Sequence, residues 1–400
     1  MKMYFRLACL VFAAGFAMAQ QRIVIDAGTL LDGKGGIRKN QQIVIEGSKI
    51  VAIGPARGKA TYDLKSMTVM PGWIDVHVHI TWHFDAHNQL FSGPENPEDA
   101  ALYAAENAWI TLQGGFTTIQ SVGAPLDAPL RDRINKGLLP GPRILTSIRQ
   151  ITNRTAGGTR EHPASPEALR EFVRKTKNEG ADLIKMFTTG SARNGPQTMS
   201  DEQIQAVCDE AKKVGLRTLV HAISDNGARA STLAGCSEIE HGDFASDATL
   251  DLMAQRGTFF DPNLLVCHNY IDKKESFPNI HDFTDLEDSI ATINSETLPH
   301  ARARKIKVVY GTDAVAGAHG RNAEEFIYRV RDAHDKPMDE LLSATSVAAE
   351  SLALGDKIGT LAPGFEADIV ATGGNMLDDI TAVRRVVFVM KGGRVYRNTR

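Results

Sequence analysis

The chain has few cysteines, and their spacing is not that of a cysteine cluster. There are four in 400 residues. Cys9 lies in an apolar leader, which leaves Cys208, Cys236 and Cys267, an odd number without a C-x-x-C pair. We therefore expect neither a disulfide framework nor a separate cysteine zinc site. Cys208 lies on the apolar stripe of a predicted helix, which predicts a packed thiol, and Cys236 lies just before a predicted strand.

An excess of basic charge is also absent. Lysine and arginine together number 45 against 48 acidic residues, for a formal net charge of −3. Proteins that bind nucleic acid usually carry a basic excess, so we exclude a nucleic-acid partner. The remaining composition, with 42% hydrophobic and 23% charged residues and no low-complexity tract, is typical of an ordinary soluble enzyme.

Long apolar runs are missing except for a short one near the start of the chain. Lys2 and Arg6 precede an apolar run from residue 7 to residue 18, and Ala17-Met18-Ala19 forms a small-x-small cleavage site. The run is short for a membrane span, so residues 1–19 are predicted to be a signal peptide. A lipoprotein is the alternative that Cys9 raises, but Arg6 stands where a lipobox needs an aliphatic residue. We expect a periplasmic or secreted protein with no membrane attachment after cleavage.

Two histidines at the end of an apolar strand give the strongest chemical signal. His77 and His79 end the run Pro71-Gly72-Trp73-Ile74-Asp75-Val76-His77-Val78-His79. Alternate residues of a strand project to one side, so both imidazoles can bind one metal ion. In a chain with 12 histidines such a pair also arises by chance, so the interpretation depends on its context.

Four further candidate ligands each follow a separate strand-like run. They are Lys185, His221, His241 and Asp313. The carboxyl ends of the strands in a parallel barrel meet at one face, where active sites lie. The sequence therefore predicts that all six side chains share one site.

Helical segments lie between these strands. The clearest begins at Ser200, which can cap a helix while Gln203 completes a capping box, and Gly215 ends it. Repeated strand–helix–strand units from about residue 70 to about residue 350 indicate parallel β-α-β units. The expected strands lie near residues 69 to 77, 117 to 121, 143 to 147, 181 to 187, 216 to 221, 237 to 241, 258 to 262 and 307 to 312. Eight such strands predict an α/β fold, a closed (β/α)8 TIM barrel.

The two ends of the chain consist instead of short strands and turns. Neither residues 20–66 nor residues 356–400 can bury a core alone. We expect them to join as one small β-sandwich beside a barrel formed by residues 67–355.

These motifs together resemble the metal-dependent amidohydrolase superfamily. The similarity is to the imidazolonepropionase-like branch, which also contains Xaa-Pro dipeptidases, arginine carboxypeptidases and ochratoxin-hydrolysing amidases. It covers nearly the whole mature chain and rests on the following segments: 28–33 (GTLLDG), 71–79 (PGWIDVHVH), 180–185 (GADLIK), 221–222 (HA), 239–242 (IEHG), 311–314 (GTDA) and 358–370 (IGTLAPGFEADIV).

The resemblance implies a role for each candidate ligand. His77, His79 and Asp313 would hold one divalent metal ion, and His221 and His241 a second, with zinc as the expected metal. Lys185 would bridge the two ions after reacting with CO2, because a free ammonium is a poor ligand whereas a carbamate presents two anionic oxygens.

The implied activity is hydrolysis of an amide bond by metal-bridged hydroxide, with Asp313 as general base and then general acid. The substrate would be a small molecule or a short peptide, which includes N-acyl amino acids and related amides. A lactonase or cyclic-amide hydrolase is the first alternative. A non-catalytic exported ligand-binding protein is the second, although all six ligands are retained. Whether the chain forms a homo-oligomer stays open.

The sequence departs from its relatives where they select substrates. Many peptidase-like members carry a histidine directly after a Gly-Gly pair beyond the third strand, whereas here Thr159 follows Gly157-Gly158. Phe244 stands where some members have a tyrosine. The candidate substrate contacts in this chain are His83, Arg160 and His162, and we predict that Arg160 binds a substrate carboxylate. Solvated loop residues are the alternative for all three.

Overall fold

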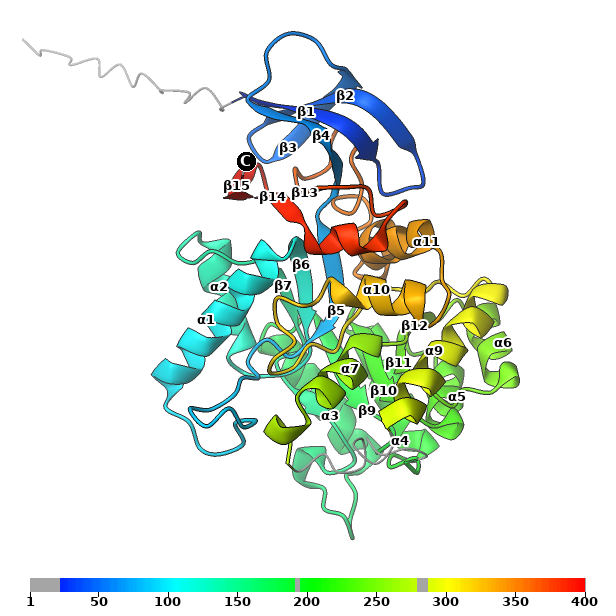
Figure 1. The fold of residues 1–400 in the computed structure, drawn as a ribbon. Coiled ribbons are helices and arrows are strands. Elements are labelled where there is room, and N and C mark those ends of the chain that lie inside the picture. The colour runs from blue at the N-terminus through cyan, green and yellow to red at the C-terminus, as the bar shows by residue number, and fades with distance from the viewer. Residues whose placement is uncertain (1–21, 191–194, 279–286, 400) are drawn as a thin grey trace, which may run out of the picture.

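The computed structural model describes residues 22–190, 195–278 and 287–399, so the predicted signal peptide lies outside the described residues. Strands from both ends of the chain lie side by side at one end of the molecule, beyond the parallel strands and their helices (Figure 1). The strands of this terminal sheet are β1 (Arg22–Leu31), β2 (Ile37–Glu46), β3 (Lys49–Pro55), β4 (Tyr62–Pro71), β13 (Ile369–Thr372), β14 (Val386–Lys391) and β15 (Arg394–Asn398).

The terminal strands form one seven-stranded sheet with the order β15-β14-β13-β4-β1-β2-β3. The two ends of the chain meet where β4 pairs antiparallel with β13, in the register Met70 to Val370. The edge strand β3 is also linked to the C-terminal part of the chain, because Ile50 donates its backbone N–H to the carbonyl of Phe365. Side chains from both ends therefore enclose one apolar core, to which Ile43 and Phe388 belong. This arrangement is compatible with the expected sandwich.

The parallel strands form two further sheets, with the orders β5-β6-β7 and β12-β11-β10-β9-β8. They are β5 (Trp73–Val78), β6 (Phe116–Ser121), β7 (Arg143–Thr146), β8 (Gln150–Ile151), β9 (Leu183–Phe187), β10 (Arg217–Ala222), β11 (Glu238–His241) and β12 (Phe259–Asp261). The first predicted strand is divided at Gly72, so residues 69–71 belong to the terminal sheet. A Cβ at residue 72 would lie 2.2 Å from Thr117 Oγ1, so this position has room only for glycine.

The expected eighth strand, residues 307–312, is not a regular strand. Val308 and Ala314 instead make single parallel bridges to Phe260 of β12 and Val78 of β5. The backbone N–H of Val76 also donates to the carbonyl of Tyr310 at 2.9 Å. In place of the predicted eight regular strands, the described chain has two parallel sheets. An irregular segment lies between β12 of one sheet and β5 of the other.

Helices cover the parallel strands, and the predicted helix start at Ser200 is confirmed. Ser200 Oγ accepts from the Gln203 backbone N–H, and Gln203 Oε1 accepts from the Ser200 N–H, so both halves of the capping box are present. The described α-helices are α1 (Pro97–Gln113), α2 (Asp127–Asn135), α3 (Pro166–Asn178), α4 (Asp201–Lys213), α5 (Asp225–Leu233), α6 (Asp247–Arg256), α7 (Leu264–Asp272), α9 (Glu287–Ala303), α10 (Glu324–Arg331), α11 (Pro337–Leu342) and α12 (Ala348–Ser351). None of them is long and apolar enough to span a membrane.

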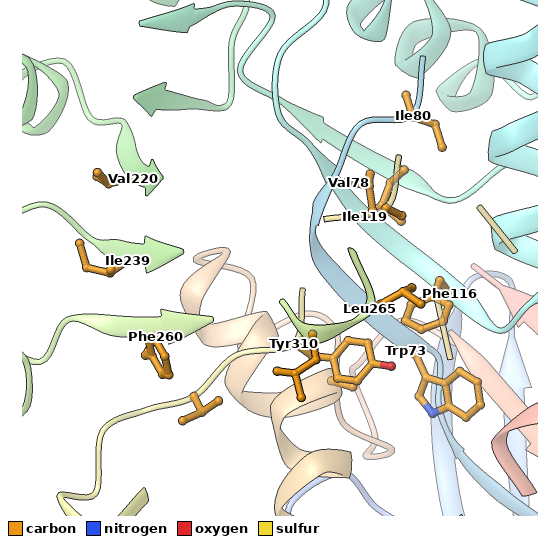
Figure 2. Close-up of a cluster of buried hydrophobic side chains, with 14 of the residues drawn as sticks. Trp73, Val78, Ile80, Phe116, Ile119, Val220, Ile239, Phe260, Leu265 and Tyr310 are labelled. Atoms are coloured by element: carbon orange, nitrogen blue, oxygen red, sulfur yellow. The ribbon is translucent and has the colours of Figure 1, made fainter. Parts of the chain in front are cut away.

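The largest apolar core packs between these strands and helices. Figure 2 shows Val220, Ile239 and Phe260 on three neighbouring strands, and the rings of Trp73 and Tyr310 at the other sheet. Because side chains alternate along a strand, residues next to Val220 and Ile239 face the opposite side. That side carries the polar residues Lys185, His221 and Glu240 described below.

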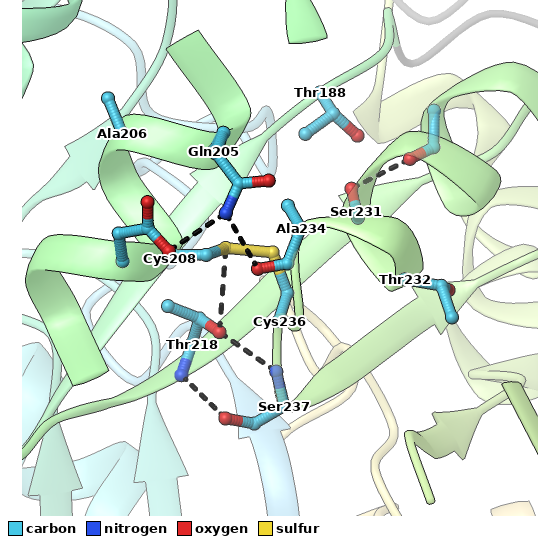
Figure 3. Close-up of a disulfide and its surroundings, with 12 residues drawn as sticks. Thr188, Gln205, Ala206, Cys208, Thr218, Ser231, Thr232, Ala234, Cys236 and Ser237 are labelled. Carbon is cyan, nitrogen blue, oxygen red and sulfur yellow. Dashed lines mark hydrogen bonds between the residues drawn. A yellow bond between two sulfur atoms is a disulfide. The ribbon is translucent and has the colours of Figure 1, made fainter. Parts of the chain in front are cut away.

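The structure corrects the expectation for two of the cysteines. Cys208 on α4 and Cys236, just before β11, form a disulfide, so Cys208 is not a packed thiol. Figure 3 shows the bond beside Thr218 of β10. An odd cysteine count argued against a disulfide framework, but it did not exclude one pair between a helix and a strand that are adjacent only in the fold. Cys267 is buried in α7.

Candidate metal centre

The first two candidate ligands lie at the carboxyl end of β5. His77 is inside the strand and His79 is the first residue beyond it, and their side chains are 1% and 8% exposed. The ring centroids lie 5.6 Å apart. Burial lowers the pKa of His77 well below its ordinary value, because the charged imidazolium loses its water shell. The ring is therefore neutral, which is the form that binds metal ions.

Asp313 approaches both histidines from the irregular segment. Its Oδ1 lies 3.1 Å from His79 Nε2 and 3.3 Å from His77 Nε2. This oxygen nevertheless lacks a hydrogen bond of good geometry. Burial alone raises the pKa of Asp313, but the neighbouring His77 and His79 outweigh it, and the pKa falls well below the ordinary value. The carboxylate is therefore ionised.

Glycine at residue 311 allows this approach. A Cβ there would lie 1.8 Å from Asp261 Oδ2 and 2.8 Å from His77 Cβ. The segment can therefore pass close enough to β5 and β12 to bring Asp313 to the histidines.

Lys185 lies on β9 at the same place and is fully buried. Its Nζ is 3.1 Å from His77 Nε2. Burial lowers the pKa of Lys185, although the nearby carboxylates of Glu240 and Asp313 oppose this effect. The uncharged amine, which is the nucleophilic form, is therefore favoured relative to an exposed lysine.

His221 and His241 complete the set from β10 and β11. Their ring centroids are 4.6 Å apart, and the His241 ring lies 5.8 Å from the His77 ring. Burial lowers the pKa of His221 well below its ordinary value and lowers the pKa of His241 to about 4. The Nε2 atoms of both rings are buried and have no hydrogen-bond partner. Buried nitrogens without partners are costly unless a ligand satisfies them.

The six predicted residues thus converge, and the donor set suits divalent metal ions. Ligand atoms of His77, His79 and Asp313 lie within 4.8 Å of one another, close enough to share one ion. His221 and His241 offer two further neutral nitrogens beside Lys185. Imidazole and carboxylate together are ligands typical of zinc.

A comparison with known families assigns the chain to one of them. The model of a family described as the amidohydrolase family matches residues 68–396. The chain belongs to the amidohydrolase family. The resemblance inferred from the motifs is therefore confirmed, and the protein is an enzyme of this class of hydrolases.

Individual relatives of this amidohydrolase cover most of its length. The ochratoxinase of Aspergillus niger is 24% identical over 424 residues, covering 94% of this chain and 86% of that protein. The imidazolonepropionase of Caldanaerobacter subterraneus subsp. tengcongensis is 24% identical and covers 85% of each chain. A Xaa-Pro dipeptidase solved with methionine bound in its active site is 30% identical, with a TM-score of 0.85 and coverage of 94% of this chain and 100% of that one.

The amidohydrolase centre rests on buried carboxylates that the sequence analysis missed. His77 Nδ1 lies 2.6 Å from Glu240 Oε2, and Asn263 Nδ2 donates to the same oxygen at 3.3 Å. With Nδ1–H donating to Glu240, the lone pair of His77 Nε2 faces Lys185 and Asp313. The signal was available in the run Ser237-Glu238-Ile239-Glu240-His241, because alternating acids in a buried strand have to face a polar interior.

A second buried network holds the irregular segment. Arg329 on α10 is fully buried and pairs with Asp261 at 2.8 Å and with Glu340 at 3.4 Å. It also donates to the carbonyls of Val309 and Gly311. The guanidinium therefore donates hydrogen bonds to a backbone segment that lacks regular strand pairing. The two carbonyls that accept them lie within four residues of Asp313.

The three candidate substrate contacts differ in their exposure. Arg160 and His162 are exposed on the loop after β8, and among the described residues none bonds to the Arg160 guanidinium. His83 is buried, and its ring stacks on Tyr103 at 3.9 Å while Nε2 lies 2.9 Å from Glu95 Oε1. Contact of these residues with a substrate stays a prediction.

Two of the ligands have an unusual backbone conformation. His241 has a φ of 64° and Asp313 a φ of 48°. Non-glycine residues rarely adopt this left-handed region, and such strain concentrates at functional sites.

Proposed function

We propose that this amidohydrolase is a binuclear metal-dependent hydrolase of amide bonds in small substrates such as peptides, N-acyl amino acids or related amides. The single observation that carries the proposal is the convergence of four imidazoles, a lysine and an ionised aspartate at one buried place. The unpartnered Nε2 atoms of His221 and His241 support it, because two cations at this centre would satisfy them.

Each ligand has a place in the proposed centre. His77, His79 and Asp313 would hold one cation, and His221 and His241 the other. When bound, two divalent cations would lower the pKa of a water molecule and polarise the substrate carbonyl. Zinc is the metal we propose, since three or more nitrogen donors favour it over magnesium or calcium.

Lys185 would link the two halves of the centre as a carbamate. Its buried amine has a lowered pKa, and an uncharged amine can add CO2 with loss of one proton. The product replaces a cation next to His77 with an anion that has two oxygen donors. A buried ammonium 3.1 Å from a histidine nitrogen that is needed for a metal would otherwise repel that metal.

Asp313 would move the proton during hydrolysis. Its carboxylate accepts a proton from the attacking water and then gives it to the nitrogen of the leaving amine. The low pKa of Asp313 keeps it ionised before the reaction. Its contact with both His77 and His79 fixes the position of the oxygen that takes the proton.

The finer features of the fold belong to the same proposal. We propose that residues 307–314 close a (β/α)8 barrel between β12 and β5, since single bridges link them to both strands. We also propose that the protein is exported. The Cys208–Cys236 disulfide supports this, because such bonds persist mainly in oxidising compartments.

Metal analysis of the purified protein tests the proposal. After expression with added zinc and bicarbonate we expect about two divalent ions per chain, and loss of hydrolysis after chelation with recovery on adding zinc. His221→Ala should lower the metal content, whereas the control His300→Ala, at a histidine whose side chain is 60% exposed, should not. Binding of one ion or none by the wild type would refute the binuclear centre. Cleavage of lactones but not of dipeptides or N-acyl amino acids would assign the site to the alternative reaction.

A further inference from the structure

A pocket lies at the loop after β5, and one of its wall residues, Trp82, contacts His79 of the proposed metal centre. Its volume is about 620 Å³, and its walls come from the loop after β5, the loop after β6 and the first turn of α1. The main lining side chains are Trp82, His83, Leu90, Phe91, Glu95 and Leu126. This size is within the range of small-molecule sites, and apolar walls with a few polar groups are typical of them.

Trp82 connects the pocket to the centre. Its ring centroid lies 5.0 Å from that of His79, and Trp82 is also part of the pocket wall. A substrate whose amide lies at His79 and Asp313 can therefore place a neighbouring group in the pocket.

The pocket wall is built by specific contacts. Asn107 Nδ2 donates to the carbonyls of Ile80 and Trp82 at 3.0 and 3.1 Å, and His319 Nε2 lies 3.2 Å from the carbonyl of Trp82. Residues 80–82 are thus held between α1 and the segment after Asp313. Trp82 nevertheless remains 37% exposed, so an apolar surface is available in the pocket wall.

The one acidic side chain among the residues that line the pocket is Glu95. Glu95 Oε1 lies 2.9 Å from His83 Nε2, which has no hydrogen bond of good geometry. The Glu95 side chain is 21% exposed. A carboxylate in the wall disfavours an anionic group in the pocket by like-charge repulsion.

We propose that this pocket selects the substrate by taking an uncharged apolar side chain, aromatic or branched aliphatic, next to the scissile amide. The proposal rests on the proposed function and deepens it, because it names the substrate class of the same site. It differs from the carboxylate contact expected of Arg160, which concerns another loop and another group of the substrate.

The test uses zinc-loaded protein and dipeptides in which glycine, leucine, phenylalanine or glutamate is placed on one side of the bond and then on the other. At one of the two positions, kcat/KM for leucine or phenylalanine should exceed that for glycine by about tenfold or more. Glutamate should be the poorest. Equal rates for glycine, leucine and phenylalanine at both positions would overturn the proposal.

Paired variants on α1 locate the effect. Ala100 lines the pocket, whereas Ala101 is exposed and does not. Ala100→Phe should remove the preference for leucine and phenylalanine over glycine, whereas Ala101→Phe should keep this preference. If Ala100→Phe does not fold, Leu126→Ala, which enlarges the pocket, should lower the leucine-to-glycine ratio. A folded pocket variant with an unchanged ratio would contradict the proposal.

Binding measurements separate this proposal from the proposed function. Calorimetry with N-acetylphenylalaninamide should give binding that N-acetylglycinamide lacks and that Ala100→Phe loses. If no dipeptide is cleaved but this binding is found, the proposed function fails and the pocket stands. If dipeptides are cleaved without any preference and N-acetylphenylalaninamide does not bind, the pocket proposal fails and the proposed function stands.

Discussion

His77 Nδ1 lies 2.6 Å from Oε2 of Glu240, a residue 163 positions away in the sequence. The contact fixes the orientation of the imidazole, and in the tautomer in which Nδ1 donates, Nε2 keeps its lone pair. Carboxylates in this position increase the basicity of a metal-binding histidine and are as much part of such a centre as the ligands are.

Replacing this carboxylate should weaken metal binding. Glu240→Gln preserves the shape of the side chain but replaces the carboxyl group that contacts His77 Nδ1 with an amide, so metal affinity should fall by about 10- to 100-fold. Titration of the metal-free protein with zinc measures the change. Glu202→Gln, at an exposed position of α4, is the control. Equal zinc affinity of Glu240→Gln and wild type would show that the contact does not support the centre.

Lys185→Ala should lose metal and activity together. The variant removes the proposed bridge and leaves space in a fully buried place, so acetate or propionate should partly restore both by supplying a carboxylate. Elemental analysis and turnover, each with and without the added acid, measure this. Lys212→Ala on the exposed face of α4 should change neither. Normal metal content in Lys185→Ala would argue against a bridging lysine.

Arg329 should be essential for stability rather than for chemistry alone. Arg329→Met removes the buried cation that Asp261 and Glu325 share and leaves Glu340 paired with Arg302 alone. Losing one member of a buried ion network costs about 3 to 5 kcal/mol. Urea unfolding at neutral pH measures the loss. The neighbouring Arg331→Met, where the side chain is 56% exposed, should cost no more than about 0.5 kcal/mol. Similar stabilities for the two variants would contradict this account.

The disulfide should contribute strongly to the free energy of unfolding. Cys208 and Cys236 are 28 residues apart, and a closed loop of this length corresponds to roughly 3 to 4 kcal/mol in the chain-entropy description. A double Cys208→Ser, Cys236→Ser variant should unfold at lower urea concentration than the oxidised wild type. Reductant should lower the stability of the wild type and leave that of the variant unchanged. A reductant effect of equal size on both proteins would assign it to another cause.

Arg160→Ala tests the predicted carboxylate contact. The change should raise KM or lower kcat/KM by about tenfold or more for a substrate with a free carboxylate, as loss of a charged hydrogen bond of roughly 1.5 to 3 kcal/mol implies. The neutral amide of that substrate should be little affected. Arg394→Ala, in the terminal sheet, is the control. If the wild type cleaves the carboxylate substrate and its neutral amide equally well, and Arg160→Ala changes neither rate, then the charged side chains of this loop are only solvated.

Strand-end position predicted that the six candidate ligands lie close together, although Asp313 follows an irregular segment and not a regular strand. His77, Lys185 and His221 follow apolar runs, and the parallel arrangement brings the ends of such runs together. The supporting residues were harder to find, because the alternating acids around Glu240 indicate a polar interior only if their strand is buried, and Asp261 resembles an ordinary surface acid in a linear sequence. Their role depends on how deeply β11 and β12 are buried, which only the assembled fold determines.

The disulfide and the irregular segment show two other limits of the sequence. Cys208 and Cys236 meet because α4 packs beside the start of β11, a tertiary relationship that no local pattern records. Residues 307–312 have the composition of a strand, but the carbonyls of Val309 and Gly311 accept bonds from Arg329 instead of joining a ladder. A distant side chain can thus replace regular pairing.

The left-handed backbone at His241 has a consequence for how one strand contributes to the centre. In a regular strand, adjacent residues face opposite sides, so Glu240 and His241 could not both serve the same place. The φ of 64° at His241 breaks this alternation just where β11 ends. Glu240 Oε2 lies 2.6 Å from His77 Nδ1, and the His241 ring lies 5.8 Å from the same His77 ring. The left-handed conformation of one residue thereby lets two consecutive side chains, those of Glu240 and His241, both lie near the His77 ring.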